Sequence, residues 1–242
     1  MIHVFRKELN SFLNSLIAYV VVGFFLAAIG LLVWVFPETS VLDSEYAGLE
    51  TLFALGPYVF VFLIPAVTMR SFSEETKLGT LELLLTKPLT DWNVVMGKFM
   101  AALALVVIAL VPTLLYYFTV SRLGNPPGNL DTSGIAGSYI GLLMLAAIFC
   151  AVGVLASSLT SNQIVAFVLA SFLCFFLYTG FDSISALPAL SKFALVIQSL
   201  GILSHYDSIS KGLIDSRDVV YFLSVCFGLL LLTKTVLSSR SW

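Results

Sequence analysis

Charged side chains are scarce in this 242-residue chain. Asp, Glu, Lys and Arg make up 11% of it, whereas hydrophobic residues make up 59%. A soluble domain carries roughly 25% charged residues, so this composition excludes an ordinary water-soluble fold. The net charge of −2 leaves no basic excess of the kind that binds nucleic acid, and no nucleic-acid partner is expected. The composition indicates an all-α, polytopic membrane protein embedded in a lipid bilayer.

The motifs of several enzyme classes are also absent. The sequence holds no G-x-x-x-x-G-K-[ST] phosphate loop, no H-E-x-x-H, no G-x-S-x-G and no C-x-x-C. His3 and His205 are isolated, and we expect them to be surface residues. Cys150, Cys174 and Cys226 lie in apolar runs, which is typical of small buried hydrophobic residues. We therefore expect no catalytic residue, cofactor or metal site in this chain.

Ionisable residues are missing from the middle of the apolar runs. Those nearest to them, such as Asp182, Asp218 and Lys234, fall at the boundaries of the runs. Carriers driven by protons or sodium usually place charged groups at mid-membrane. A hydrolase inside the membrane needs an acid, a base or a metal ligand. The sequence therefore argues against both classes.

Long apolar runs are abundant, and they predict six membrane-spanning helices in a single domain of residues 1–242. A helix needs about 20 predominantly apolar residues to cross a bilayer. The predicted spans are residues 15–36, 52–69, 95–120, 136–159, 163–181 and 218–237. Residues 183–204 form a shorter run that Pro188 and Lys192 interrupt, so we expect an outer re-entrant or interfacial helix there.

The distribution of Lys and Arg predicts the orientation. If both termini and the 70–98 loop are cytoplasmic, the cytoplasmic side holds eight of the twelve basic residues: Arg6, Lys7, Arg70, Lys77, Lys87, Lys98, Lys234 and Arg240. Cytoplasmic loops of membrane proteins are enriched in these residues. We therefore expect both termini to be cytoplasmic.

Residues 1–14 have an amphipathic pattern. One helical face carries Ile2, Phe5, Leu9, Phe12 and Leu13, and the polar residues Arg6, Lys7, Glu8 and Asn10 lie elsewhere. This pattern predicts an interfacial helix that lies in the headgroup plane before the first span.

A polar stretch separates the second and third spans, and it predicts a helix over residues 71–88. Ser71 or Ser73 can cap this helix, and Glu74 and Glu75 suit the positive end of its dipole. Ser71 and Glu74 also have the spacing of a capping box. Pro88 stops the helix.

The helical wheel of this stretch has two arcs. The apolar arc carries Leu78, Leu81, Leu84 and Leu85, and the other carries Glu75, Gly79, Glu82 and Thr86, with Leu83 on its shoulder. The apolar arc can rest on the bundle or membrane while the other faces the cytosol and a soluble partner. Gly79 inside a helix costs about 1 kcal/mol relative to alanine, but it would permit close approach by another backbone. An ordinary solvated loop helix is the alternative.

The segment from Met69 to Pro88 contains an Arg, an acidic pair, Gly-Thr-x-Glu-x-Leu-Leu and a final Pro. It resembles the signature of ABC-2 type transporter permeases, and Gly97-Lys98 at the start of the next span matches as well. The similarity extends over most of the chain. Within that family, residues 5–9 and 64–70 are similar to the gliding-motility-associated permease subunit of Bacteroidetes. Permeases of nitrous-oxide-reductase maturation are near relatives.

The resemblance implies a type V exporter-like bundle in the bacterial cytoplasmic membrane. Two permease subunits would pair, as a homodimer or a heterodimer, and each would engage a separate cytoplasmic ATPase subunit that binds ATP and magnesium. The segment from Glu74 to Thr86 would be the coupling helix. The residues expected to contact the ATPase subunit are Glu74, Glu75, Gly79, Thr80, Glu82, Leu83 and Thr86.

Three functions follow from these observations. The chain is expected to be the membrane subunit of an ATP-driven exporter or mechanochemical complex, with gliding motility as one role. The alternatives are a membrane scaffold that recruits a soluble protein through residues 71–88, and a membrane-embedded enzyme that acts on lipid. The cargo is not determined, because lipid, polysaccharide, peptide and copper-enzyme maturation factors are all compatible.

Overall fold

The computed structural model describes residues 1–43, 47–80, 90–126 and 128–239, and within these ranges it contains helices and no strand. Five helices in the described part of the chain are long and apolar enough to cross a membrane. A sixth crossing results if the bent pair α1 (Ile2–Leu13) and α2 (Leu16–Trp34) is counted as one. The predicted all-helical membrane fold is confirmed.

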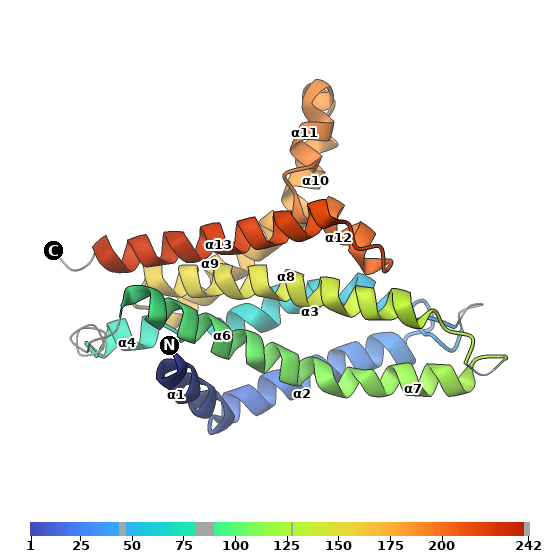
Figure 1. Cartoon of the computed structure of the whole chain (residues 1–242), viewed down its shortest axis with the longest axis horizontal. Helices are drawn as coiled ribbons and strands as arrows, with labels where there is room; N and C mark the ends of the chain where they lie inside the picture. The colour runs from blue at the N-terminus through green and yellow to red at the C-terminus, as the bar shows by residue number, and fades with distance from the viewer. Residues whose placement is uncertain (44–46, 81–89, 127, 240–242) are drawn as a thin grey trace.

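The central helix of the bundle is α8 (Thr132–Leu159). It packs against α3 (Glu50–Thr68), against α13 (Ser216–Ser239) and against helices described below. Figure 1 shows these helices along the long axis of the molecule, with α1 and the last turns of α13 at the same end. Close packing against α3 depends on Gly153, because a Cβ at this position would overlap the side chain of Thr68.

The third predicted span is interrupted at Pro112. Its parts are α6 (Asp91–Leu110), a 3-10 turn (Val111–Thr113) and α7 (Leu114–Leu123). Proline has no N–H and its ring clashes with the carbonyl four residues earlier, so the α-helical hydrogen bonding is broken there. Figure 1 shows α7 continuing in nearly the direction of α6.

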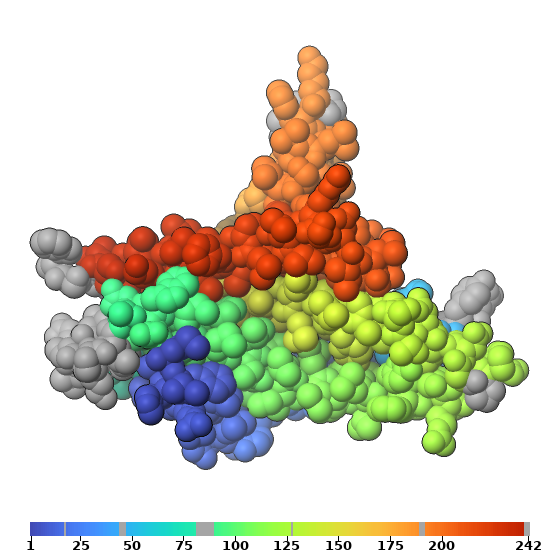
Figure 2. Space-filling model, in the orientation of Figure 1, coloured from blue at the N-terminus to red at the C-terminus, as the bar shows by residue number. Residues whose placement is uncertain are grey.

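The fifth predicted span leaves the bundle before it ends. It begins as α9 (Gln163–Phe175), widens into a π-helical turn (Phe176–Gly180) and continues as α10 (Phe181–Ser185). We call residues 181–200 the arm, because they stand out from the side of the bundle in Figures 1 and 2. The exposed apolar side chains of the arm include Leu187, Phe193, Leu195 and Leu200.

The single helix predicted for residues 183–204 is replaced by shorter pieces. A 3-10 segment (Pro188–Phe193) and α11 (Ala194–Gln198) complete the arm, and α12 (Ile202–Ser210) returns to pack on α8. Proline disfavours the α conformation of the residue before it, which explains the break before Pro188.

The bundle therefore has two distinct ends. We call the end that holds α1, α4 (Ser73–Lys77) and the last turns of α13 the terminal end. The opposite end, which holds the α2–α3 and α7–α8 connections and the C-terminus of α12, is the loop end. Polar side chains gather at both ends, so each end is a candidate functional site.

Candidate functional site

A buried lysine organises the terminal end. The side chain of Lys98, on α6, is 1% exposed, and its Nζ lies 3.0 Å from Glu8 Oε1 and 3.0 Å from Glu75 Oε2. It also donates to the Ser71 carbonyl at 2.6 Å and lies 5.0 Å from the centre of the Phe72 ring. A charge removed from water is costly unless opposite charges and hydrogen bonds replace the water. The contacts of Lys98 meet this condition.

Lys7 completes this group, which we call the ionic cluster: Lys7, Glu8, Glu75 and Lys98. Lys7 Nζ lies 3.2 Å from Glu75 Oε1 and 3.7 Å from Glu8 Oε1. Partial burial lowers the pKa of Lys7, but the two carboxylates outweigh burial and the pKa is raised. A raised lysine pKa means that this interaction is present at neutral pH and is lost only above about pH 10.5.

A second ion pair lies beside the cluster on the more exposed side of α4. Arg70 Nε is 3.1 Å from Glu74 Oε2, and its Nη2 donates to Glu74 Oε1 at 3.3 Å. Two parallel bonds of this kind fix the geometry of both side chains. Glu74 is therefore directed along α4 toward Arg70.

The start of α4 is capped from another helix. Ser157 Oγ, on α8, accepts hydrogen bonds from the backbone N–H of Phe72 at 2.9 Å and of Ser73 at 3.0 Å, and donates to the Met69 carbonyl at 3.0 Å. The predicted cap by Ser71 or Ser73 is wrong, because the side chain of Ser73 donates back to Met69. Tertiary packing supplies the cap, so local sequence could not show it.

The end of α4 is set by Gly79, which has a φ of +68°. The N–H of Gly79 donates to the Thr76 carbonyl at 3.3 Å, and the N–H of Thr80 donates to the Glu75 carbonyl at 3.0 Å. This pair of bonds is the Schellman motif, in which glycine adopts the left-handed conformation and terminates a helix. The prediction of one continuous helix across Gly79 is therefore wrong.

The structure separates the predicted contact residues into three groups. Glu74 and Glu75 are engaged in ion pairs, whereas Gly79 and Thr80 are exposed. Glu82, Leu83 and Thr86 lie outside the described residues. Leu78, which the helical wheel placed on the apolar arc, is 67% exposed. The other residues of that arc lie outside the described residues.

Sequence reasoning missed two members of the ionic cluster. The amphipathic pattern places Glu8 with the polar residues of α1 away from its apolar face, yet Glu8 is buried and faces Lys98. The sequence assigns Lys98 to the charges of the 70–98 loop, yet Lys98 lies within α6 and is buried. A carboxylate on an amphipathic helix and a lysine inside an apolar run are complementary, and this is the signal that could have paired them.

A pocket of about 390 Å³ opens between α1 and α4. Its lining includes the ionic cluster, Arg70, Leu78 and Thr80. Ser71 also lines it, and its buried hydroxyl has no hydrogen-bond partner among the residues that the structure describes. The pocket is polar, and its lysines and carboxylates are already paired with one another.

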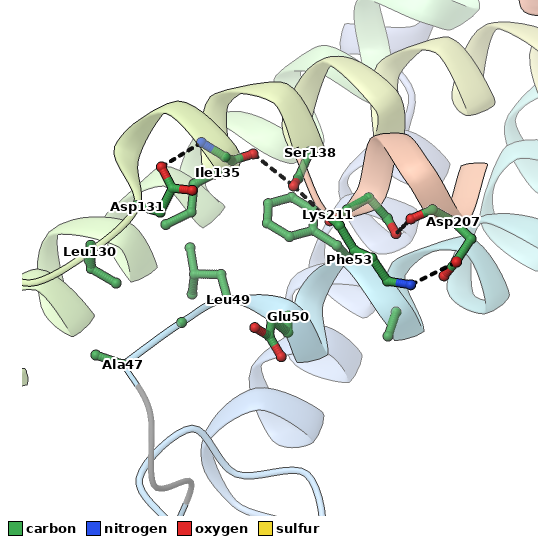
Figure 3. A pocket seen from close by; sticks show the side chains of 14 residues that line it. Ala47, Leu49, Glu50, Phe53, Leu130, Asp131, Ile135, Ser138, Asp207 and Lys211 are labelled. Atoms are coloured by element: carbon green, nitrogen blue, oxygen red, sulfur yellow. Dashed lines mark hydrogen bonds and ion pairs between the residues drawn. The ribbon is translucent and has the colours of Figure 1, made fainter. Parts of the chain in front are cut away.

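The loop end has a second pocket, of about 370 Å³, between the start of α3, the start of α8 and the end of α12 (Figure 3). Asp131 caps α8 by accepting from the Gly134 N–H at 2.9 Å; this bond and the Ser133 hydroxyl lower the pKa of Asp131. Lys211 Nζ lies 2.7 Å from Asp207 Oδ2. These polar side chains therefore cap a helix or pair with a residue one turn away.

Buried Ser138 also lies at this pocket. Its hydroxyl donates to the Ser210 carbonyl at 2.7 Å and so joins α8 to α12. Within the described residues, no group of three or more His, Cys, Asp or Glu side chains is placed to hold a metal ion.

His205 is not the isolated surface residue that the sequence suggested. Its Nδ1 lies 2.6 Å from Asp218 Oδ1, its Nε2 lies 3.0 Å from the Ser199 carbonyl oxygen, and its ring stacks on Tyr221 at 4.0 Å. These contacts tie α12 to α13 and to the base of the arm. They form a structural link.

Comparison with known proteins bears on the terminal end. A sequence model of the family described as "ABC-2 family transporter protein" matches residues 42–237. Comparison with curated proteins gives no match. The matched range includes Glu75 and Lys98 and leaves out α1, which carries Lys7 and Glu8.

Proposed function

The chain belongs to the ABC-2 family of transporter proteins, and we propose that its terminal end is where a separate ATPase subunit drives it. It is the membrane permease of such a transporter, a domain that lacks an ATPase site. The free energy of ATP hydrolysis must therefore enter through contact with another chain.

The observation that carries this proposal is the exposed tip of α4, residues 77–80. The tip follows a helix that Ser157 caps from α8 and that Glu75 joins to the ionic cluster. Leu78 projects from it with 67% of its surface exposed. An exposed apolar side chain is suited to bind in a groove of a partner. Because hydrogen bonds and ion pairs hold α4 to the bundle, a displacement of the tip is passed to the helices that hold it.

The proposed contact residues are revised accordingly. Gly79 and Thr80 belong to the tip, and Glu74 lies at its edge with Arg70. Glu75 is assigned to the ionic cluster, where it acts within the permease. Glu82, Leu83 and Thr86 stay in the proposal through the family resemblance, and Glu82→Lys is expected to weaken ATPase binding while leaving membrane insertion unchanged.

The assembly and location are also proposals. The excess of basic residues on the side of residues 70–98 supports a cytoplasmic tip and cytoplasmic termini, in a bacterial cytoplasmic membrane. Among the candidate spans, α9 and α13 are the least covered by the rest of the chain, which leaves apolar surface for lipid or a second permease subunit. A role in gliding motility rests on residues 5–9 and 64–70 alone.

Photo-crosslinking from the tip tests the proposed function. A photo-reactive residue replaces Leu78 in native membranes, and the matched control replaces Leu213 at the loop end, which is 68% exposed. We expect Leu78 to crosslink to a Walker-motif ATPase and Leu213 not to do so. Equal crosslinking from both positions, or none from Leu78 while the complex is intact, would contradict the assigned surface.

A further inference from the structure

We propose that Lys98 is a positioning residue that joins α1 to α4, so that the N-terminal helix moves with the tip that the ATPase drives. This inference rests on the proposed function for the driving force. The physical link between α1 and α4 is argued from the structure alone.

The two lysines and the two carboxylates of the ionic cluster alternate around a square, so that each charge has two neighbours of opposite sign. Each lysine lies within 4.0 Å of both carboxylates, at 3.0 and 3.0 Å for Lys98 and at 3.2 and 3.7 Å for Lys7. Glu8 belongs to α1, Glu75 to α4 and Lys98 to α6. The square therefore joins three segments that are far apart in the sequence.

The two lysines differ in their access to water. The side chain of Lys7 is 60% exposed, whereas that of Lys98 is 1% exposed. If α4 moved away from α1 and α6, water could replace Glu75 beside Lys7, whereas Lys98, whose side chain is 1% exposed, would lose one of its two carboxylates. Because an uncompensated buried charge is costly, α4 and α1 are expected to keep their positions relative to Lys98.

Close packing places α1 beside Lys98. Gly97 precedes Lys98, and a Cβ at Gly97 would lie only 2.8 Å from Val4 Cβ. Val4 is buried, and Figure 2 shows the start of the chain lying against the first part of α6. This contact brings Glu8, one turn after Val4, within reach of the ammonium group. The helix that the sequence predicts to be an interfacial anchor is thus also part of the support of α4.

The first experiment measures the link in the permease alone, in lipid nanodiscs. Hydrogen exchange of residues 2–13 is compared for wild type, Lys98→Met, Lys98→Arg and the neutral triple variant Glu8→Gln/Glu75→Gln/Lys98→Met. The triple variant leaves no unpaired buried charge, so it stays informative if Lys98→Met does not fold. We expect about tenfold faster exchange of α1 in the triple variant, unchanged exchange of α8, and near wild-type behaviour in Lys98→Arg.

The second experiment adds the ATPase subunit. ATP hydrolysis per bound ATPase is expected to fall about fivefold in the triple variant, with binding changed by less than about twofold and activity recovered in Lys98→Arg. Lys234→Met is the matched control, because Lys234 is exposed on α13 and makes no ion pair with any described residue. A purely structural role would lower the yield of folded protein and leave hydrolysis per bound ATPase unchanged.

The outcomes separate the two proposals. Unchanged exchange of α1 in the triple variant would overturn the link, and faster exchange with normal hydrolysis per bound ATPase would overturn its role in coupling. If wild type binds no ATPase subunit, the proposed function fails and the coupled motion fails with it, while the exchange data still decide whether Lys98 joins α1 to α4.

Discussion

Both ends of the bundle contain ion pairs between lysines and carboxylates. The paired residues are far apart in the sequence at the terminal end and close together in the sequence at the loop end. At the terminal end, Glu8 pairs with the buried Lys98 and Lys7 pairs with Glu75, so that ion pairs join separate helices. At the loop end, Lys211 pairs with Asp207 one turn away, and both side chains are more than half exposed.

This difference shows where ion pairs determine structure. An exposed pair contributes roughly 0–1 kcal/mol, because water solvates the charges almost as well. A buried pair need not stabilise the fold relative to apolar residues, but removing one partner is strongly destabilising. The terminal end is therefore sensitive to single charge changes, and the loop end tolerates them.

The largest expected effect comes from Lys98→Met. It leaves two carboxylates beside a buried position, so we expect a loss of about 3–5 kcal/mol in the free energy of unfolding. Thermal unfolding in detergent measures it. Lys211→Met is the comparison at the loop end, where the expected loss is below about 0.5 kcal/mol. Similar losses in both variants would remove the distinction between the two ends.

His205→Asn tests the polar link between α12, α13 and the base of the arm. Asp218 is 8% exposed and loses its histidine partner, which should cost about 1.5–3 kcal/mol. Hydrogen exchange should also become faster at residues 194–200, because the base of the arm loses its contact with the imidazole. An unchanged exchange pattern in the arm would show that the arm is held by other contacts.

Gly153→Ala extends the comparison from charge to packing. The added methyl group would overlap Thr68, so α3 and α8 must separate near the terminal end, at a cost of about 1–3 kcal/mol. Gly23→Ala is the matched control, because a Cβ at Gly23 meets nothing within 4 Å. Equal stability of the two variants in thermal unfolding would argue against the close contact of α3 with α8.

Among the four test substitutions, controls aside, Asn162→Ala has the smallest expected effect. Asn162 Oδ1 accepts from the Ile164 N–H at 2.9 Å and caps α9. Its removal should cost about 1 kcal/mol, and Asn162→Asp should retain the cap. This local cap should behave as the exposed pair at the loop end does. A loss as large as that of Lys98→Met would show that burial is not what separates the two classes of contact.

The spans were predictable because a long apolar run must satisfy its own backbone in lipid, and a helix is the only single segment that does so. The glycine of α4 carried a readable signal as well. A glycine inside a helix is unfavourable, and it can indicate either close approach by a partner or a left-handed helix end. The local sequence allows both interpretations, and only the observed φ of Gly79 decides between them.

The ionic cluster could not be derived in the same way. Glu8, Glu75 and Lys98 become neighbours only once α1 lies against α6 and α4, which continues from the end of α3, lies beside both. The cap by Ser157 has the same origin, because it joins residues 85 positions apart. Helical periodicity reports on neighbours three and four residues away, so it contains no information on such contacts.

Two serines on α8 have a mechanical consequence. Ser157 bonds to the start of α4, and Ser138 bonds to the last residue of α12. The two hydroxyls lie on one uninterrupted helix, about 28 Å apart along its axis. If α8 rotates as a rigid body, the hydrogen bonds of Ser157 and Ser138 change together. No other helix has to move to connect the two ends. Rotation of a single helix therefore gives the permease a direct way to relate the geometry of its two ends.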